Sequence, residues 1–307
     1  MKLENLQMHP FSTTMMGVLK GVLDYYGIEM SDALAFGGSG HAFLINIHEI
    51  ICPSGPYCWK YDGFVKLARN LGLEMIDLGF FHAGNSPNER EKVERAIKEH
   101  LDQGRPCSLA NMEHQMIPGY DDQKLFTAQP WPKCTDFPPA TLTFGSWAEL
   151  GKEVHINFFA FKKLAKKDDA TIARDSLRHA IELFRNPEKY SQEHYGIGLR
   201  AYDNWAKAVE AGHGSSHGNW WNAQVWSECR AMAADYFAEG ASKSKGDIAA
   251  RSRELSQDYK EIADLLKRIG NKEMPAGEKV GIIHDLRARE EKAVRKIEEF
   301  VQFLGNT

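Results

Sequence analysis

The spacing of apolar residues changes near residue 162, and this change constrains the fold more than any other feature of the sequence. Before it, short alternating and β-branched stretches are interspersed with helical patterns, whereas after it nearly every segment has the period of an amphipathic helix. The charged stretch 162–169 (KKLAKKDD) lies at the transition and is predicted to be a linker. We therefore expect an α+β domain over residues 1–162 and an all-α helical domain over residues 163–307.

The first domain is predicted to begin with a helix. In STTMMGVLKGVLDYYG, residues such as Met15, Val18 and Val22 lie on one helix face, serine and threonine residues precede them as caps, and Gly27 is a stop signal. Further helices are expected in YDGFVKLARNLG and SPNEREKVERAIKEHLDQG. Strands are expected in HAFLINIHEII, LEMIDLGFF, RPCSLANM, HQMIPGYDDQKLFTAQPW and VHINFFAF, with YDDQ as the tightest turn of an antiparallel meander.

The second domain is predicted to consist of helices alone. DATIARDSLRHAIELFRNP and YGIGLRAYDNWAKAVEAG are amphipathic, and NWWNAQVWSECRAMAADYFAEGA is longer and more apolar, as in a central helix. Two charged segments, 248–269 and 275–304, are expected to pack as an antiparallel hairpin.

Composition excludes several classes of protein. With 43% hydrophobic and 26% charged residues the chain resembles a globular protein, and a net charge of -4 disfavours a nucleic-acid-binding role. No apolar run approaches the roughly 20 residues that span a bilayer, and the N-terminal stretch lacks the apolar core of a signal peptide, so neither a membrane nor secretion is expected. We predict a cytoplasmic protein.

The five cysteines are scattered and odd in number, which is not typical of a disulfide framework. They are predicted to be buried free thiols, although Cys52 and Cys58 could pair if the turn between them brings them together. No CxxC motif occurs, and His213 and His217 have no third ligand nearby in sequence. No metal site and no cofactor are therefore predicted, and the stretch GHGSSHGNWW is expected to be a flexible interdomain loop.

A candidate reaction centre emerges from the order of the first domain. Cysteine-peptidase-like folds place a nucleophile at a helix N-terminus, opposite a histidine that takes its proton and a polar group that orients that histidine. Here a capped helix is followed, about a hundred residues later, by a strand that carries His114.

These residues carry a resemblance to a known family. A helix ending in Tyr-Tyr-Gly, a later GRP strand and a histidine before Gly-Tyr-Asp resemble the papain-like peptidase domains that process bacteriocin leaders. The stretches YYGIEMSDALAFGGSGHAF and GLRAYDNWAKAV resemble the butirosin biosynthesis protein H family, whose type member transfers an acyl group from a carrier protein to an aminoglycoside. The resemblance spans nearly the whole chain and implies a papain-like domain followed by a helical domain.

The resemblance assigns three catalytic positions. The nucleophilic cysteine of the family falls on Thr14, thirteen positions before Gly27, the histidine falls on His114, and the orienting Asp or Asn falls on Gln129. Threonine is far less acidic than a thiol and its β-branch restricts the rotamer for attack, and a neutral amide stabilises an imidazolium less than a carboxylate does. Low hydrolytic activity is therefore expected.

Other residues are candidates for the same site. Ser12 or Thr13 could replace Thr14 as the nucleophile, although all three are equally good helix caps, and Cys107 is a weaker substitute because it is expected in the middle of a core strand. The glycine-rich stretch GGSGH, with Gly40 and His41, lacks the lysine of a phosphate loop and is interpreted as a tight turn or as backbone that approaches a ligand closely. Ser12, Thr13, Gly40 and His41 are the predicted binding residues.

Three functions remain open. The first is a degenerate relative of the acyltransferases whose cleft binds a small amide, peptide or acyl ligand. The second is an active acyl or aminoacyl transferase or amidase with His114 as the base and an acyl carrier protein as a candidate partner. The third is a structural protein that self-associates into a homo-oligomer through its C-terminal helices.

Overall fold

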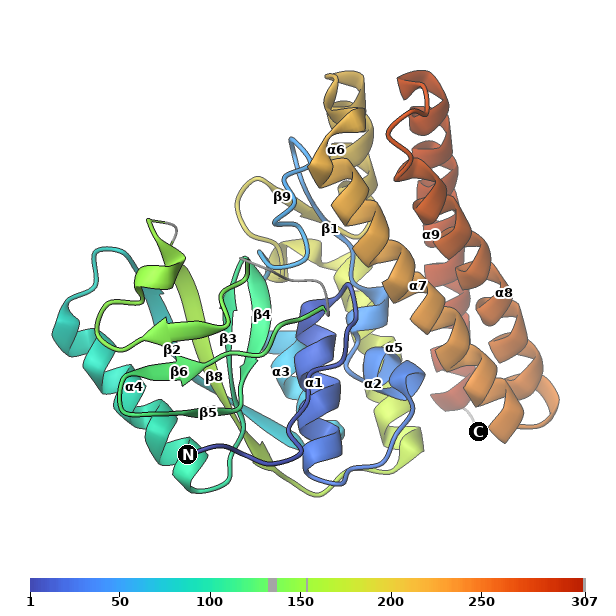
Figure 1. The fold of residues 1–307 in the computed structure, drawn as a ribbon. Helices are drawn as coiled ribbons and strands as arrows, with labels where there is room; N and C mark the ends of the chain where they lie inside the picture. Colours follow the sequence, from blue (N-terminus) through green and yellow to red (C-terminus); the bar gives the residue numbers. More distant parts are fainter. Residues whose placement is uncertain (132–136, 153, 306–307) are drawn as a thin grey trace. The chain divides into compact units, whose positions relative to one another are not determined.

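The computed structural model describes residues 1–131, 137–152 and 154–305 (Figure 1). Its helices and small antiparallel sheets make an α+β fold, as the sequence predicts. Two compact units form within it: unit 1 comprises residues 1–30 and 68–166, and unit 2 comprises residues 31–67 and 167–307. The division near residue 166 agrees with the predicted linker. Residues 31–67, however, belong with the helical unit, whereas the sequence assigned them to the first domain.

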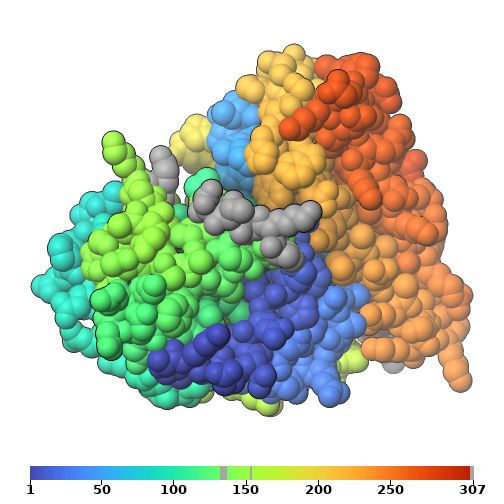
Figure 2. Space-filling view, in the orientation of Figure 1, coloured from blue at the N-terminus to red at the C-terminus, as the bar shows by residue number. Residues whose placement is uncertain are grey.

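Unit 1 is built on a four-stranded antiparallel sheet with the strand order β2-β8-β3-β4. A smaller sheet, β5-β6-β7, adjoins the N-terminus through a bridge between Lys2 and Gly119, and Figure 2 shows these first residues on the surface beside the green strand residues. The elements are α1 (Thr14–Tyr25), β2 (Leu73–His82), α4 (Pro87–Asp102), β3 (Cys107–Asn111), β4 (Glu113–Ile117), β5 (Gly119–Tyr120), β6 (Lys124–Phe126), β7 (Thr141–Thr143), η2 (Ala148–Leu150) and β8 (His155–Lys163).

Most of the predicted helix ends, caps and turns of unit 1 are present in the structure. Gly27 ends α1 with a φ of 64°, a left-handed conformation that glycine adopts readily. Ser86 and Glu89 form a capping box at the start of α4. In the YDDQ turn, Asp121 accepts the backbone N–H groups of Gln123 and Lys124. The expected cap of α1 is different: Thr13 is the N-cap residue, but its side chain makes no capping hydrogen bond to the helix.

Two glycines fix α1 in place. A Cβ atom at Gly17 would lie 2.4 Å from the carbonyl oxygen of His9, and one at Gly21 would lie 2.1 Å from that of Gln7. The segment before the helix therefore packs directly onto its backbone, and the His9 N–H donates to the Gly17 carbonyl at 3.2 Å. Any larger side chain at these positions would push this segment away and displace the helix N-terminus.

Unit 2 is dominated by helices packed around α7. Its elements are α2 (Asp32–Gly38), η1 (His41–Phe43), β1 (Asn46–His48), α5 (Asp169–Arg185), η3 (Pro187–Lys189), β9 (Tyr195–Ile197), α6 (Leu199–Glu210), η4 (His213–Ser215), α7 (His217–Lys243), α8 (Gly246–Ile269) and α9 (Ala276–Gly305), while α3 (Asp62–Asn70) crosses the boundary between the units. As predicted, α7 is long and central, and α8 packs against α9. The stretch HAFLINIHEII forms only a short strand, β1, which pairs with β9.

A buried ion pair explains why residues 31–67 belong to the helical unit. Arg230 on α7 donates through Nε to Glu290 on α9, and through Nη1 to the carbonyl oxygens of Ala42 and Leu44 at 2.8 Å each. The side chains of Arg230 and Glu290 are completely buried. Burial of an ion pair is costly unless hydrogen bonds compensate it, so these contacts hold segment 42–44 against the two helices.

Candidate functional site

The Thr14 hydroxyl links α1 to β4. It donates to Oε2 of Glu113 at 2.8 Å and accepts the backbone N–H of His114 at 3.0 Å. The exposed fraction of the residue surface is 0% for Thr14 and 8% for Glu113. The predicted nucleophile position and the predicted histidine are thus brought together, but the contact is to the backbone of His114, and the hydroxyl proton points to a carboxylate.

The β4 strand presents His114 on the same side as α1. Residues 114 and 116 share one face of the strand because side chains alternate. A Cβ at Gly21 would lie 2.3 Å from Cε of Met116, which shows that this face packs on α1. The face of β4 that carries His114 and Met116 therefore packs against the middle of α1.

His114 is nearly completely buried, with 1% of its surface exposed, and burial lowers its pKa to about 3. The cause is desolvation, which disfavours the charged imidazolium. A general base is most effective when its pKa is near the working pH. His114 is therefore neutral at pH 7 and much weaker as a base than an ordinary histidine.

Gln129 is partly buried and its amide Nε2 donates to the Pro138 carbonyl at 2.8 Å. Cys107 lies in the middle of β3, between β4 and β8, and is fully buried. Burial raises the pKa of the Cys107 thiol far above its ordinary value, so the thiolate that attack requires is disfavoured. The surroundings of Cys107 are those of a core residue.

The predicted binding residues lie in different units. Ser12 and Thr13 precede α1 in unit 1, whereas Gly40 and His41 follow α2 in unit 2. The His41 ring is buried among the rings of Trp59, Phe64 and Trp226.

Gly40 has the positive φ of a tight turn, 76°, which agrees with one of the two interpretations of GGSGH. A Cβ atom at Gly40 would lie 2.6 Å from the ring of His179, so the close neighbour of this backbone is a side chain of unit 2. The cavity beside it has a volume of about 10 Å³, enough for roughly one water molecule.

The stretch GHGSSHGNWW is not an interdomain loop. It connects α6 to α7 inside unit 2, where Ser216 caps α7 by accepting the N–H of Asn219 at 3.1 Å. His217 is the first residue of α7 and packs beside Trp220. Trp205 and Trp226 are fully buried, whereas Trp220 is 39% exposed.

The cysteines were predicted to be buried free thiols. Among the described residues, Cys107 and Cys229 are buried thiols, and Cys52 and Cys58 are partly buried thiols. Cys134 lies outside the described residues.

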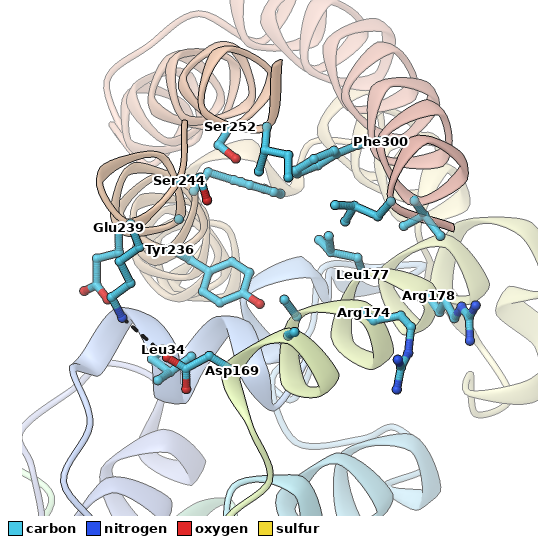
Figure 3. A pocket seen from close by; sticks show the side chains of 18 residues that line it. Leu34, Asp169, Arg174, Leu177, Arg178, Tyr236, Glu239, Ser244, Ser252 and Phe300 are labelled. Atoms are coloured by element: carbon cyan, nitrogen blue, oxygen red, sulfur yellow. Dashed lines mark ion pairs between the residues drawn. The ribbon is translucent and has the colours of Figure 1, made fainter. Parts of the chain in front are cut away.

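Unit 2 contains a cavity of about 430 Å³ that sequence reasoning missed (Figure 3). This volume lies within the range of about 300 to 1,000 Å³ that is typical of small-molecule sites. Helices α2, α5, α7, α8 and α9 form its walls, and its apolar lining consists of Leu34, Ala170, Ala173, Leu177, Phe237, Gly240, Ile248, Phe300, Val301 and Leu304. In Figure 3, Leu177 and Phe300 approach the space between the helices from opposite sides.

The polar groups of the cavity are few. Tyr236 hydrogen-bonds to Ser176 at 3.1 Å, and burial raises the pKa of Tyr236 to about 12, so its hydroxyl is neutral. Ser244 and Ser252 complete the uncharged polar lining, and the charged lining residues are Asp169, Arg174, Arg178, Glu239 and Lys243. An apolar cavity with a few polar groups can hold a small ligand but offers no activated nucleophile.

Two observations bear on the class of protein. Within residues 1–131, 137–152 and 154–305, no helix has both the length and the apolar character needed to cross a membrane. No protein-family model matches the chain, and no curated protein matches it either.

Proposed function

We propose that this protein binds a small, largely apolar ligand in the cavity of unit 2 and does not hydrolyse it. The observation that carries the proposal is the 430 Å³ cavity with its apolar walls. Of the ligands that the sequence suggests, an acyl group suits these walls better than a polar amide or peptide, because apolar surface gains most from leaving water.

The surroundings of Thr14 support a binding role over catalysis. Its hydroxyl oxygen accepts the His114 N–H, and its hydroxyl proton is donated to the Glu113 carboxylate. No part of Thr14 is exposed. A nucleophile in this state would need a rearrangement of α1 or β4 before it could reach a substrate. We interpret the hydrogen bonds of Thr14 as a structural link that keeps the N-terminus of α1 beside the strand of His114, as in a papain-like fold. On that basis we propose that the fold is related to that of the butirosin H family.

Gly240 offers a direct test of the binding site. It lies on α7 and lines the cavity, and a Cβ atom there would have as its nearest neighbour Ser252 Oγ at 3.8 Å, an ordinary contact. We expect the neutral fluorophore N-phenylnaphthylamine to bind the wild-type protein and to bind Gly240→Leu at least about tenfold more weakly, because the new side chain occupies part of the cavity.

Gly240→Ala is the matched control, since it changes the same helix position but adds only one carbon atom. It should retain binding. Failure of the wild-type protein to bind the fluorophore, or equal binding by Gly240→Leu, would refute the proposal.

One contact favours a second candidate, acyl transfer. The Thr14 hydroxyl and the Glu113 carboxylate, 2.8 Å apart, have the arrangement of a nucleophile and a base. In such a reaction Thr14 Oγ1 would attack the carbonyl carbon of an activated ester while its proton passes to Glu113, the ester C–O bond would break, and Glu113 would return the proton to the departing oxygen so that the alcohol leaves. Incubation with p-nitrophenyl acetate and intact-mass spectrometry tests this candidate: a stoichiometric adduct that Thr14→Val and Glu113→Gln both lose would establish it, and we expect no such adduct.

The proposal also includes the ligand, the location and the partner protein that the sequence predicts. A small acyl ligand and a cytoplasmic location are expected, with an acyl carrier protein as a candidate donor. Self-association through the C-terminal helices is tested separately by sedimentation velocity, because a ligand-binding role requires no second copy.

A further inference from the structure

Two arginines lie at one edge of the unit 2 cavity. Arg174 and Arg178 both lie on α5, four residues apart, which places them on one face of the helix. Both are exposed, and Figure 3 shows their guanidinium groups at the edge of the pocket rather than among the apolar side chains. Long cationic side chains that line an apolar site in this way keep their charge in water at its mouth.

The other charges of the lining are already engaged. Lys243 pairs with Asp169 at 3.7 Å, Arg174 lies 3.4 Å from Asp175, and Glu239 accepts a hydrogen bond from Ser31 at 2.8 Å. Among the described residues, Arg178 is the lining cation that has no acidic partner. Like charges four residues apart on a helix repel each other, and an anion between them would relieve this repulsion.

We propose that the occupant of the cavity is an amphipathic anion, with an apolar body between the helices and a single carboxylate or phosphate head held by Arg178 and Arg174. The inference rests on the proposed function, since it specifies the ligand of the same cavity. Guanidinium groups suit both heads because their planar N–H donors match carboxylate and phosphate oxygens in pairs. A cationic head would instead meet Arg178 at the mouth, where Asp169 is already paired with Lys243.

Four twelve-carbon probes separate the contribution of the head from that of the body. Dodecanoate, dodecyl phosphate, dodecanol and dodecyltrimethylammonium are titrated, below their micelle concentrations and at low salt, against the complex of the full chain with N-phenylnaphthylamine. We expect at least one of the two anions to displace the fluorophore at about tenfold lower concentration than dodecanol, and the cation to compete least. The stronger of the two anions identifies the head group.

Arginine variants test which residue recognises the head. Arg178→Gln should weaken the preferred anion about tenfold while dodecanol is unaffected, because a hydrogen bond to a charged partner is lost. Arg253→Gln is the matched control: Arg253 is an exposed arginine on α8 that does not line the cavity, and its loss should change nothing. The difference between anion and alcohol should also shrink at high salt.

The outcomes distinguish the two levels of the proposal. If dodecanol and the anions compete equally, or if Arg178→Gln and Arg253→Gln behave alike, the anionic head is refuted while the apolar site stands. If the cation competes best, the charge preference is reversed and the inference is wrong. If the fluorophore binds the Gly240→Leu variant as tightly as the wild-type protein, the proposed function itself fails.

Discussion

The two candidate regions of the molecule have complementary properties. In unit 1, Thr14, Glu113 and His114 have the side chains of a reaction centre, but all three are buried, and the Thr14 hydroxyl is hydrogen-bonded to the Glu113 carboxylate and to the backbone of His114. In unit 2, a cavity of about 430 Å³ has room for a ligand, but its walls are mostly apolar and it contains no paired nucleophile and base among the described residues.

The difference teaches that reactive residue types and an accessible space are separate requirements. A histidine becomes a useful base only where solvation or a charged partner keeps its pKa near neutrality. A cavity persists only where small side chains leave space, as Ala170, Ala173 and Gly240 do on α5 and α7. Four predictions follow this comparison, in order of decreasing expected effect.

Acidification should destabilise the protein through His114. In the unfolded chain this histidine binds a proton below pH 6.5, whereas in the folded protein it stays neutral down to about pH 3. Its contribution to the free energy of unfolding is therefore complete above pH 6.5 and is lost as the pH falls towards 3, by on the order of 4 kcal/mol. Urea denaturation of wild-type protein and His114→Gln at a series of pH values measures the effect.

The same experiment compares the units. His179 in unit 2 has a pKa lowered to about 4, chiefly by burial, so His179→Gln should remove a smaller part of the pH dependence. Equal slopes for the wild-type protein and His114→Gln would show that His114 is solvated.

Thr14→Val should destabilise the fold by about 3 kcal/mol, because it leaves a buried N–H group and a buried carboxylate without this partner. Thr14→Ser retains the hydroxyl and should recover most of the loss. Both variants should bind N-phenylnaphthylamine like the wild-type protein, and weaker binding by Thr14→Val at a temperature where it is folded would place the ligand site in unit 1.

A bound ligand should raise the thermal midpoint through unit 2. At a concentration one hundred times its Kd, a ligand that binds only the native state adds about 2.7 kcal/mol. Thermal unfolding with and without the preferred twelve-carbon probe should show this gain in Thr14→Ser and not in Gly240→Leu. A gain in Gly240→Leu would mean that the ligand binds elsewhere.

Gly240→Ala should stabilise the protein by up to about 1 kcal/mol, because alanine is the better helix former and the added Cβ meets only an ordinary contact. The gain is measured by urea denaturation. Gly21→Ala is the contrasting variant in unit 1 and should be destabilising, because a Cβ there would lie 2.1 Å from a carbonyl oxygen. A loss of stability in Gly240→Ala would mean that the cavity is already filled at this position.

The sequence predicted the elements whose signals are local. The periodicity of α1, the stop at Gly27 and the capping box of α4 depend on neighbouring residues, so they could be recognised in one chain. The assignment of residues 31–67 depends on Arg230, which hydrogen-bonds to Ala42 and Leu44 from 186 or more positions away. No local pattern encodes such a contact.

The candidate sites show the same limit. His114 could be identified from its motif, but its burial and its lowered pKa arise from packing. Glu113 was missed although it stands next to His114, because a glutamate at the start of a strand is usually exposed. The cavity was missed because it results from side chains of five helices, each of which has an ordinary amphipathic pattern.

The most direct test of the central claim is a crystal structure of the protein with dodecanoate brominated at its terminal carbon. The account predicts an anomalous bromine peak in unit 2 between Leu177 and Phe300, with the carboxylate beside Arg178. A bromine peak or ligand density beside Thr14 or His114 would contradict this prediction and would favour unit 1 as the functional site.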